Sequence, residues 1–578
     1  MTTAKNLAIM QTPMWMLDCL LLLAPSTVAP TKSHCGDHRL AGIDSRCRSH
    51  EPHPTRDILL VALLSLGFRA FNLLSLPIFV DEATYLNWAL DIWEQRTRAA
   101  LMMPIVEDGK QPLFMWLAGG ASYLFSDPLV AGRMVSVLAG VASAVGVYVG
   151  GCCLAGRRAG LLAGLLYAVM PFNLLYDRMA LVEALLNAGG IWAFTLSVYI
   201  VCRAGKTRTA ILAGAGLGVA LGTALWTKMP ALFMLPFPLL CAFLLSRRDR
   251  LGAVAWGFAT AAAVFAVASA LLFLAPQSEH LWDKAESFSE SPLSLLTFPL
   301  ERWQYNAERY WTWFHIYLPT PLWEMTLLAV VWGLIRWTRP TLLLVGCWAA
   351  FTMPTFLLSR TGMFQSRYVS EGVFPLLLLQ ATLLAAAYGP LRTVAAYRWP
   401  SIGTRAHKEG FAATVLFILL TIRALWFDAL LLSKPESAPL APTDHTLLVT
   451  DVTSGYGFRE AMELLKKRAA ELTRNGQPII VLGDYYYGQT YSGLKMYMRG
   501  MPGVFFYVDS HMAREPEGFI DAWKSHHVPI LLMGNDGWDR LDAFEQGVPQ
   551  AKRLGFFPKP GGKSSFRVYE VDVADLER

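Results

Sequence analysis

Long apolar stretches recur between residues 57 and 432 of this 578-residue chain, and short polar connections separate them. Several exceed the roughly 20 apolar residues that an α-helix needs to cross a bilayer. The pattern predicts a polytopic α-helical membrane protein with about eleven transmembrane helices in a domain covering residues 56–432. The predicted spans are 57–75, 129–153, 159–176, 181–202, 209–227, 229–245, 251–275, 321–338, 341–358, 371–388 and 410–432.

Composition agrees with this prediction. Hydrophobic residues make up 54% of the chain and charged residues only 16%, whereas soluble proteins carry about 25% charged residues. The net charge of +6 comes without a clustered basic face, which nucleic-acid binding requires, so we expect no nucleic-acid partner. Five of the eight cysteines lie in or beside apolar spans and are interpreted as small core residues rather than a disulfide framework.

The charges of the connections predict how the chain crosses the cell membrane. Lys and Arg gather in every second connection, and such connections face the cytoplasm. The basic residues concerned are Arg157, Arg158, Arg203, Lys206, Arg208, Arg247, Arg248, Arg250, Arg336, Arg339, Arg392, Arg398, Arg405 and Lys408. The N-terminus is therefore expected in the cytoplasm, and loops 76–128 and 276–320 are expected outside. Within the first loop, the aromatic-rich segments 83–95 and 110–125 are interpreted as interfacial helices.

The two ends of the chain differ from the apolar part. Residues 1–55 are interpreted as a disordered N-terminal extension or as a start placed too early, because their Cys and His residues do not follow a usual zinc spacing. Residues 440–578 contain short apolar runs such as "TLLVTDV", "PIIVLGD", "GVFFYVD", "VPILLMG" and "FRVYEVD", with helical stretches between some of them. This alternation predicts a small α/β domain, placed outside the cytoplasm by the loop charges.

Two adjacent carboxylates, Asp81 and Glu82, stand where the chain leaves the first apolar span. Taken alone, they fit a polar stop at the membrane boundary, with Asp81 as a helix N-cap. More ionisable residues, however, follow at outer boundaries. They are Lys110, Asp177, Arg178, Glu183, Lys228 and Arg367, the last beside Tyr368. Charged residues at membrane depth are costly and usually face a cavity or one another, so both signs on one side indicate a site.

Such a site fits transfer from a lipid-linked sugar phosphate in the outer leaflet. A carboxylate would take the proton of an acceptor hydroxyl as it attacks the anomeric carbon. The leaving lipid phosphate would need cations, for which Lys110, Lys228 and Arg367 are candidates. No soluble nucleotide is needed, which agrees with the lack of a complete phosphate-binding loop in residues 440–578.

Six motifs occur in an order and spacing that is typical of one family. They are "DEATY", "KQPLFMWLAG", "GRMVSVLAGVASAVGVYVGG", "YDRMALVEALLNA", "WTKMPALFMLP" and "SRYVSEGVFPLLLL". Over about residues 57–390 the chain resembles the polyprenyl-phosphate-sugar-dependent membrane glycosyltransferases of the GT-C fold. The protein O-mannosyltransferases and the aminoarabinose lipid A transferases are the members that it resembles most.

The resemblance implies roles for individual residues. Asp81 matches the acidic residue of the first loop, the general base of the family, and Glu82 completes the acidic pair. Lys110 matches the lysine associated with the lipid phosphate, and Lys228 matches the lysine of a second segment. Glu183 stands where many relatives carry Asp. The family also implies an inverting transfer.

Other matches and departures complete the comparison. Arg367 and Tyr368 match a polar pair of the late outer loop, and Arg178 is added to the phosphate-binding candidates. Gln111 replaces a proline of the family pattern, and Met229 replaces a glycine. No cofactor is expected with certainty, although Asp81, Glu82 and Glu183 are able to hold a divalent cation.

Alternative functions remain open from the residues alone. A transporter or flippase of a lipid-linked sugar would use the same charges without chemistry, although no inverted repeat is visible. A relative that only binds a lipid is a third possibility. The acceptor of a transferase is left open among a protein, a glycan and a glycolipid.

Overall fold

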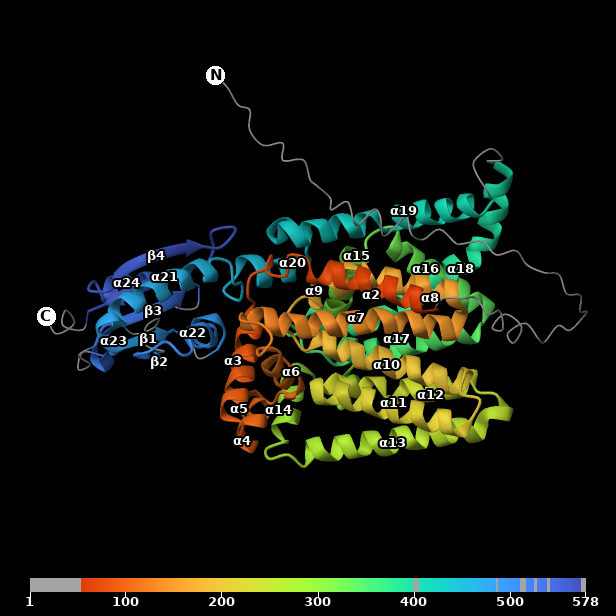
Figure 1. Ribbon diagram of the computed structural model, residues 1–578, viewed down its shortest axis with the longest axis horizontal. Coiled ribbons are helices and arrows are strands. Elements are labelled where there is room, and N and C mark those ends of the chain that lie inside the picture. Colours follow the sequence, from red (N-terminus) through yellow and green to blue (C-terminus); the bar gives the residue numbers. More distant parts are fainter. Residues whose placement is uncertain are drawn as a thin grey trace, which may run out of the picture.

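The computed structural model describes residues 54–398, 405–484, 487–509, 516–523, 528–537 and 541–572. A bundle of long helices occupies most of the molecule, and a smaller α/β domain lies at one end of the bundle (Figure 1). The predicted extension 1–55 lies outside the described residues except for its last two.

A helix lies in each of the eleven ranges that the sequence predicts as spans. These helices are α2 (Pro54–Ala70), α7 (Pro128–Ala155), α8 (Arg157–Ala168), α10 (Glu183–Cys202), α11 (Thr207–Thr227), α12 (Pro236–Leu245), α13 (Leu251–Phe273), α16 (Leu322–Arg336), α17 (Arg339–Leu358), α18 (Val373–Arg398) and α19 (Arg405–Ser433). Within the described residues, seven segments are long and apolar enough to cross a membrane. An eighth is added if α15 (Leu300–Tyr317) and α16, bent by 113°, form one span. The fold class is confirmed, and the count of eleven stays a prediction.

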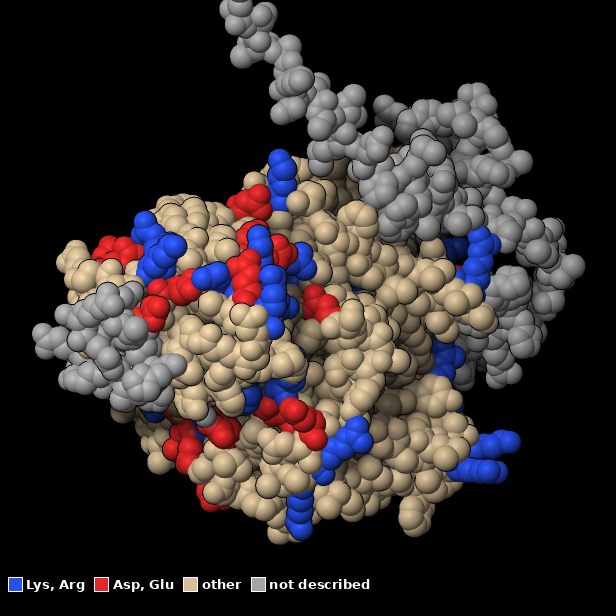
Figure 2. All heavy atoms as spheres, turned by 60° about the vertical axis from the view of Figure 1, so that its left-hand side comes forward, with Lys and Arg blue, Asp and Glu red and all other residues tan. Residues whose placement is uncertain are grey.

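Small residues let neighbouring helices of the bundle approach closely. At the contact of α10 with α11, a Cβ added to Gly189 would lie 2.8 Å from the Cβ of Ala224. Side chains of this size are typical of helix contacts in membranes, where close backbone packing replaces the hydrophobic effect. In the view of Figure 2, charged side chains gather towards the α/β domain, and the side of the bundle is largely uncharged.

The first loop folds into short helices at the end of the bundle that carries the α/β domain, and α3 lies next to that domain (Figure 1). They are α3 (Val80–Gln95), α4 (Arg98–Leu101), α5 (Met103–Asp108) and α6 (Leu113–Ala121). The helices predicted at 83–95 and 110–125 are therefore present. Tyr85 and Trp88, however, are only 5% and 9% exposed, because α3 is covered by protein. These two aromatic rings pack inside the molecule instead of facing lipid headgroups.

The α/β domain contains one five-stranded sheet with the order β2-β1-β3-β5-β4. Its strands are β1 (Ile479–Gly483), β2 (Val504–Val508), β3 (Ile530–Asn535), β4 (Lys552–Pro558) and β5 (Ser565–Val571). β1 pairs in parallel with β2 and β3, and β5 pairs antiparallel with β3 and β4. The helices of the domain are α21 (Phe458–Leu472), α22 (Leu494–Met498), α23 (Pro516–Trp523) and α24 (Leu541–Gly547).

Four of the five quoted runs form strands, the fifth is helical, and one strand of the sheet was missed. "TLLVTDV" begins with a helical turn, η6 (Thr446–Thr450), that follows α20 (Pro442–His445). β4 was not predicted, because "KRLGFFP" starts with two charges and lies at the sheet edge, where one side of a strand faces solvent.

Candidate active site

A helical hairpin brings an acidic and a basic side chain together. α10 begins at Glu183 and runs away for 20 residues, which corresponds to about 30 Å. α11 returns to the same end and is followed directly by Lys228. The Lys228 Nζ donates a hydrogen bond to Glu183 Oε1 at 2.8 Å. It also lies 4.3 Å from the centre of the Tyr368 ring.

Arg367 connects this pair to Asp81. It lies in the turn η4 (Ser366–Gly372), which leads into α18. Its Nη1 donates to Asp81 Oδ2 at 2.6 Å, and its Nε lies 3.9 Å from Glu183 Oε1. Its Nη2 donates to the Tyr368 hydroxyl at 3.3 Å. One guanidinium therefore lies between two carboxylates that come from different outer segments.

Lys110 approaches Asp81 from the other side through a tyrosine. The Lys110 Nζ lies 2.8 Å from Asp108 Oδ2 and donates to the Tyr487 hydroxyl at 3.0 Å. That hydroxyl donates to Asp81 Oδ1 at 2.9 Å. Both oxygens of Asp81 are thus engaged, one by a guanidinium and one by a phenol.

These contacts fix the charge state of both groups. Burial of Asp81 opposes its ionisation, but Arg367 and Lys110, with the hydrogen bonds from Arg367 and Tyr487, hold the pKa of its carboxyl well below the usual range. Burial of Lys110 opposes its charge, but Tyr487, Asp81 and Asp108 raise the pKa of its amine above the usual value. Asp81 is therefore an anion and Lys110 a cation at neutral pH.

Six of the eight candidate residues of the sequence lie in this one charged group. They are Asp81, Lys110, Glu183, Lys228, Arg367 and Tyr368. Glu82 and Arg178 are not brought into it.

Glu82 is fully buried on another side of α3 and faces α7. Its Oε1 accepts from Arg133 Nε at 2.8 Å and from the backbone N–H of Ala180 at 2.6 Å. Its Oε2 accepts from Arg133 Nη2 and from the backbone N–H of Phe79, both at 2.8 Å. With two partners on each oxygen, this carboxylate connects the start of α3 to two other segments.

Arg178 is turned towards the end of α2. Its Nη1 donates to the backbone carbonyls of Phe68, Arg69 and Phe71, and its Nη2 donates to that of Asn72 at 2.8 Å. The last carbonyls of a helix lack partners within the helix, and a cation there is favourable. Arg178 therefore closes α2.

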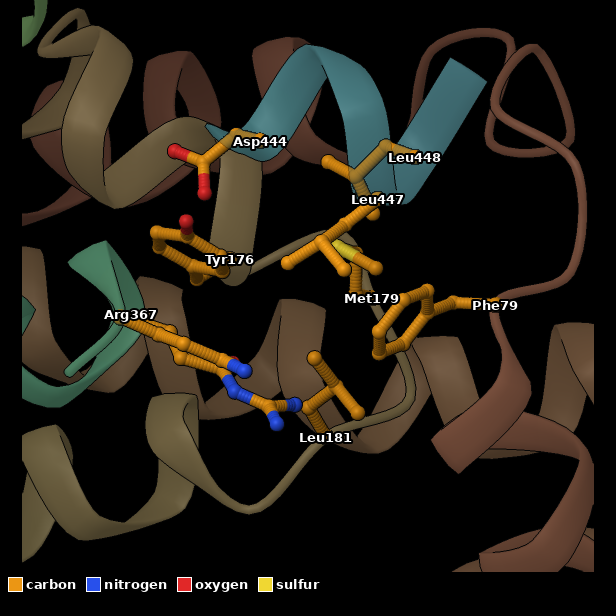
Figure 3. Close-up of a pocket in the computed structure, with 9 residues that line it drawn as sticks. Phe79, Tyr176, Met179, Leu181, Arg367, Asp444, Leu447 and Leu448 are labelled. Atoms are coloured by element: carbon orange, nitrogen blue, oxygen red, sulfur yellow. The ribbon is translucent and has the colours of Figure 1, made fainter. Parts of the chain in front are cut away.

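A pocket lies beside Arg367 (Figure 3), and its walls are mostly apolar, with Phe79, Leu181 and Leu447 among them. A buried carboxylate, Asp444 of α20, contributes to another wall. It accepts from the Ser366 hydroxyl at 2.7 Å and from Tyr317. Burial raises the pKa of the Asp444 carboxyl above its usual value.

Sequence reasoning missed Tyr487 and Asp444. Both belong to the polar C-terminal part, whose contacts with the first loop leave no local pattern. The one signal near Tyr487 is a run of three tyrosines before Gly488, directly after a strand.

The candidate cation ligands are not gathered into one set. Asp81 and Glu183 share Arg367, and Glu82 accepts four hydrogen bonds from three other residues. Among the described residues, no three His, Cys, Asp or Glu side chains are placed to hold a metal ion. These three carboxylates therefore do not fit a shared cation, and no step is assigned to one.

Part of loop 276–320 also packs against the charged group. Lys284 of α14 (His280–Phe288) donates to Asp108 Oδ1 at 2.5 Å. The ring of Phe288 lies 5.9 Å from that of Tyr368, edge to face. The loop thus extends the site on the side of Lys110 and Tyr368.

The chain is similar to known glycosyltransferases in sequence and in structure. Residues 109–273 match the family model described as dolichyl-phosphate-mannose-protein mannosyltransferase. No curated protein matches the chain. The solved structures that are similar over nearly the whole chain include two of ArnT from Cupriavidus metallidurans.

The apo structure of that ArnT has 14% identity and a TM-score of 0.54, covering 90% of this chain and 98% of its own. The structure with bound undecaprenyl phosphate has 15% identity and a TM-score of 0.52, covering 91% and 99%. The resemblance seen in the sequence is therefore confirmed at the level of the fold, and the chain has the fold of the GT-C membrane glycosyltransferases.

Proposed function

We propose that the chain is an integral membrane glycosyltransferase that moves a sugar from a polyprenyl-phosphate donor to an acceptor hydroxyl at the outer face of the membrane. The observation that carries the proposal is the group of three cations around Asp81 and Glu183. The similarity to ArnT bound to undecaprenyl phosphate and to the mannosyltransferase family model supports the same donor class.

The lipid phosphate would bind between Lys110, Lys228 and Arg367. The three side chains are 13% to 22% exposed, so a phosphate is able to approach them. In a partly dry site each cation is worth more to a developing negative charge than in water. Tyr368 contacts both Arg367 and Lys228 and would hold these two cations close to each other.

Asp81 would act as the general base. The acceptor oxygen forms a bond to the anomeric carbon, and its proton goes to an Asp81 oxygen. The bond between that carbon and the phosphate oxygen breaks, and its electron pair leaves with the lipid phosphate. Attack from the face opposite the leaving group inverts the anomeric centre.

Donor binding would also raise the basicity of Asp81. Arg367 and Lys110 are the cations that lower the pKa of this carboxyl, and a general base is most effective when its pKa is near the working pH. A bound phosphate shares those cations and so moves the pKa of Asp81 upwards. The donor is therefore expected to bind before the base becomes effective.

Glu183 would keep Lys228 and Arg367 in place, and Glu82 and Arg178 would hold the segments that carry the site.

The proposal is tested with purified protein and a panel of radiolabelled polyprenyl-phosphate sugars. Wild type should transfer or slowly hydrolyse at least one donor. Asp81→Asn should lose this turnover by a factor of about 100 or more, the size of one general-base contribution, and should still bind undecaprenyl phosphate.

Glu94→Gln is the matched control, because Glu94 lies on the same helix with its side chain 66% exposed. It should keep the turnover of wild type. Donor binding without turnover across the panel would instead favour a transporter or flippase.

A further inference from the structure

The C-terminal domain reaches the charged group through the side chain of Tyr487. Tyr487 follows β1 of that domain, whereas Asp81, Lys110 and Arg367 belong to the membrane domain. The Tyr487 hydroxyl donates to Asp81 Oδ1 at 2.9 Å and accepts from Lys110 Nζ at 3.0 Å. A residue of the second domain thus lies between the proposed base and a proposed phosphate ligand.

The local backbone holds Tyr487 in this position. The N–H of Gly488 donates to the Thr84 hydroxyl on α3 at 3.1 Å. The side chain of Gln489 donates to the carbonyls of Ile78 and Thr453 at 3.2 Å and 2.8 Å. Both residues after Tyr487 are therefore bound to the segment that carries Asp81.

Ion pairs extend the same interface along α3. The Lys495 Nζ lies 3.0 Å from Asp91 Oδ2, and Arg499 Nη2 lies 2.6 Å from Asp91 Oδ1. Arg499 also pairs with Glu94. Since α22 and its flank are bound to the polar face of α3, the placement of Tyr487 is a property of the docked domain.

The two hydrogen bonds on Asp81 differ in how easily they exchange. Oδ2 accepts from a guanidinium, and Oδ1 accepts from a neutral phenol. The carboxylate charge strengthens both bonds, and the bond from the guanidinium is the stronger of the two because both of its partners are charged. An acceptor hydroxyl is a neutral O–H donor, as the phenol is. It can therefore take the place of the Tyr487 hydroxyl on Oδ1 with no change in the number of hydrogen bonds.

We propose that Tyr487 occupies the position of the acceptor hydroxyl on Asp81, so that the docked C-terminal domain decides whether an acceptor or water reaches the base. The inference rests on the proposed glycosyl transfer. The acceptor displaces the tyrosine hydroxyl and then loses its proton to Oδ1. Without an acceptor, the tyrosine keeps water from this oxygen and protects the donor from hydrolysis.

The test compares Tyr487→Phe with wild type and with Tyr497→Phe. Tyr497 is the matched control because its hydroxyl also donates to a carboxylate across the domain interface, that of Asp127, at 3.2 Å. The donor is the polyprenyl-phosphate sugar of the panel that wild type turns over. Each protein is incubated with this donor and no acceptor, and the release of sugar is measured. Tyr487→Phe should release sugar about 10 to 100 times faster, the range that one hydrogen bond to a charged group is worth, and Tyr497→Phe should equal wild type.

A second measurement does not depend on turnover. A water-soluble carbodiimide with glycine ethyl ester labels accessible carboxyl groups, and mass spectrometry of the peptide with Asp81 reports the extent. Labelling of Asp81 should rise in Tyr487→Phe and not in Tyr497→Phe. The melting temperatures of wild type and the two variants should be alike. If labelling increased but none of the proteins turned over any donor, the proposed glycosyl transfer would be refuted. The shielding of Asp81 by Tyr487 would still be supported. Unchanged labelling, or slower sugar release in Tyr487→Phe, would overturn the inference.

Discussion

Two neighbouring carboxylates at the start of α3 have separate surroundings. Successive residues of an α-helix point about 100° apart, since 3.6 residues make one turn. Asp81 therefore faces Arg367 and Tyr487, and Glu82 faces Arg133 and the backbone of Ala180. In the proposed function, the first carboxylate would act in the chemistry and the second would support the fold around it.

This division predicts different results for the two residues. Glu82→Gln leaves the buried Arg133 without a full counter-charge, and breaking a buried ion pair costs about 3 to 5 kcal/mol. We expect a lower melting temperature in detergent, whereas turnover per folded molecule stays close to that of wild type.

Glu94→Gln, at an exposed residue of the same helix, is the control for the effect of Glu82→Gln on stability. Its ion pair with Arg499 lies at the surface, and exposed pairs contribute up to about 1 kcal/mol, so Glu94→Gln should melt near wild type. If Glu82→Gln melted like wild type but lost turnover, Glu82 would belong to the chemistry instead.

The sequence predicted most of the charged group because ionisable residues at apolar boundaries stand out along the chain. It could not separate Asp81 from Glu82, because their roles depend on which neighbour each meets in space. Tyr487 and Asp444 could not be found for another reason. Tyr487 is 406 residues from Asp81, and Asp444 is 78 residues from Ser366, and contacts over such separations have no local signature.

At the scale of elements, α3 is the surface on which the two domains meet. Its first turn carries Asp81, and its later polar residues bind α22 and the segment before it. The approach is close at Gly488, which has a φ of +86° and a ψ of −151°, a combination available almost only to glycine. A Cβ added there would lie 2.4 Å from Val80 Cγ2.

Gly488→Ala should therefore loosen the docking of Tyr487. The backbone strain and the clash with Val80 act together, and overpacking alone costs about 1 to 3 kcal/mol. The melting temperature should fall, and carbodiimide labelling of Asp81 should rise as it does in Tyr487→Phe.

Gly500→Ala separates strain from contact. Gly500 also has a positive φ, +80°, but an added Cβ would meet no atom within 4 Å. It should lower the melting temperature less than Gly488→Ala and leave Asp81 labelling unchanged. Equal effects of the two substitutions would show that the contact with Val80 is unimportant.

Elements with a strong repeating pattern were predicted well, and short ones were not. Each long apolar run contains a helix, since burial in a bundle and helical hydrogen bonding favour the same structure. "TLLVTDV" was mistaken for a strand because a short apolar run does not distinguish a strand from a helical turn. Its Leu447 and Leu448 instead line the pocket beside Arg367.

Over the whole molecule, the charged group and the basic connections lie at opposite ends of the bundle. α10 leads from Glu183 to the connection after Cys202, about 30 Å for its 20 residues. At that far end, Arg250 Nη1 donates to the carbonyl of Cys202 at 2.5 Å, which places the basic connection after α12 beside the one after α10. If basic connections face the cytoplasm, the C-terminal domain and the site lie outside.

Cysteine labelling in intact cells tests this orientation. In a background with the eight native cysteines replaced, Lys563→Cys in the C-terminal domain should react with a membrane-impermeant maleimide in intact cells. Lys206→Cys, in the connection between α10 and α11, should react only after the membrane is permeabilised. Both positions are exposed, so reactivity reports the side of the membrane and not burial. The reverse pattern would place the site in the cytoplasm, and the donor would then have to present its sugar at the inner leaflet.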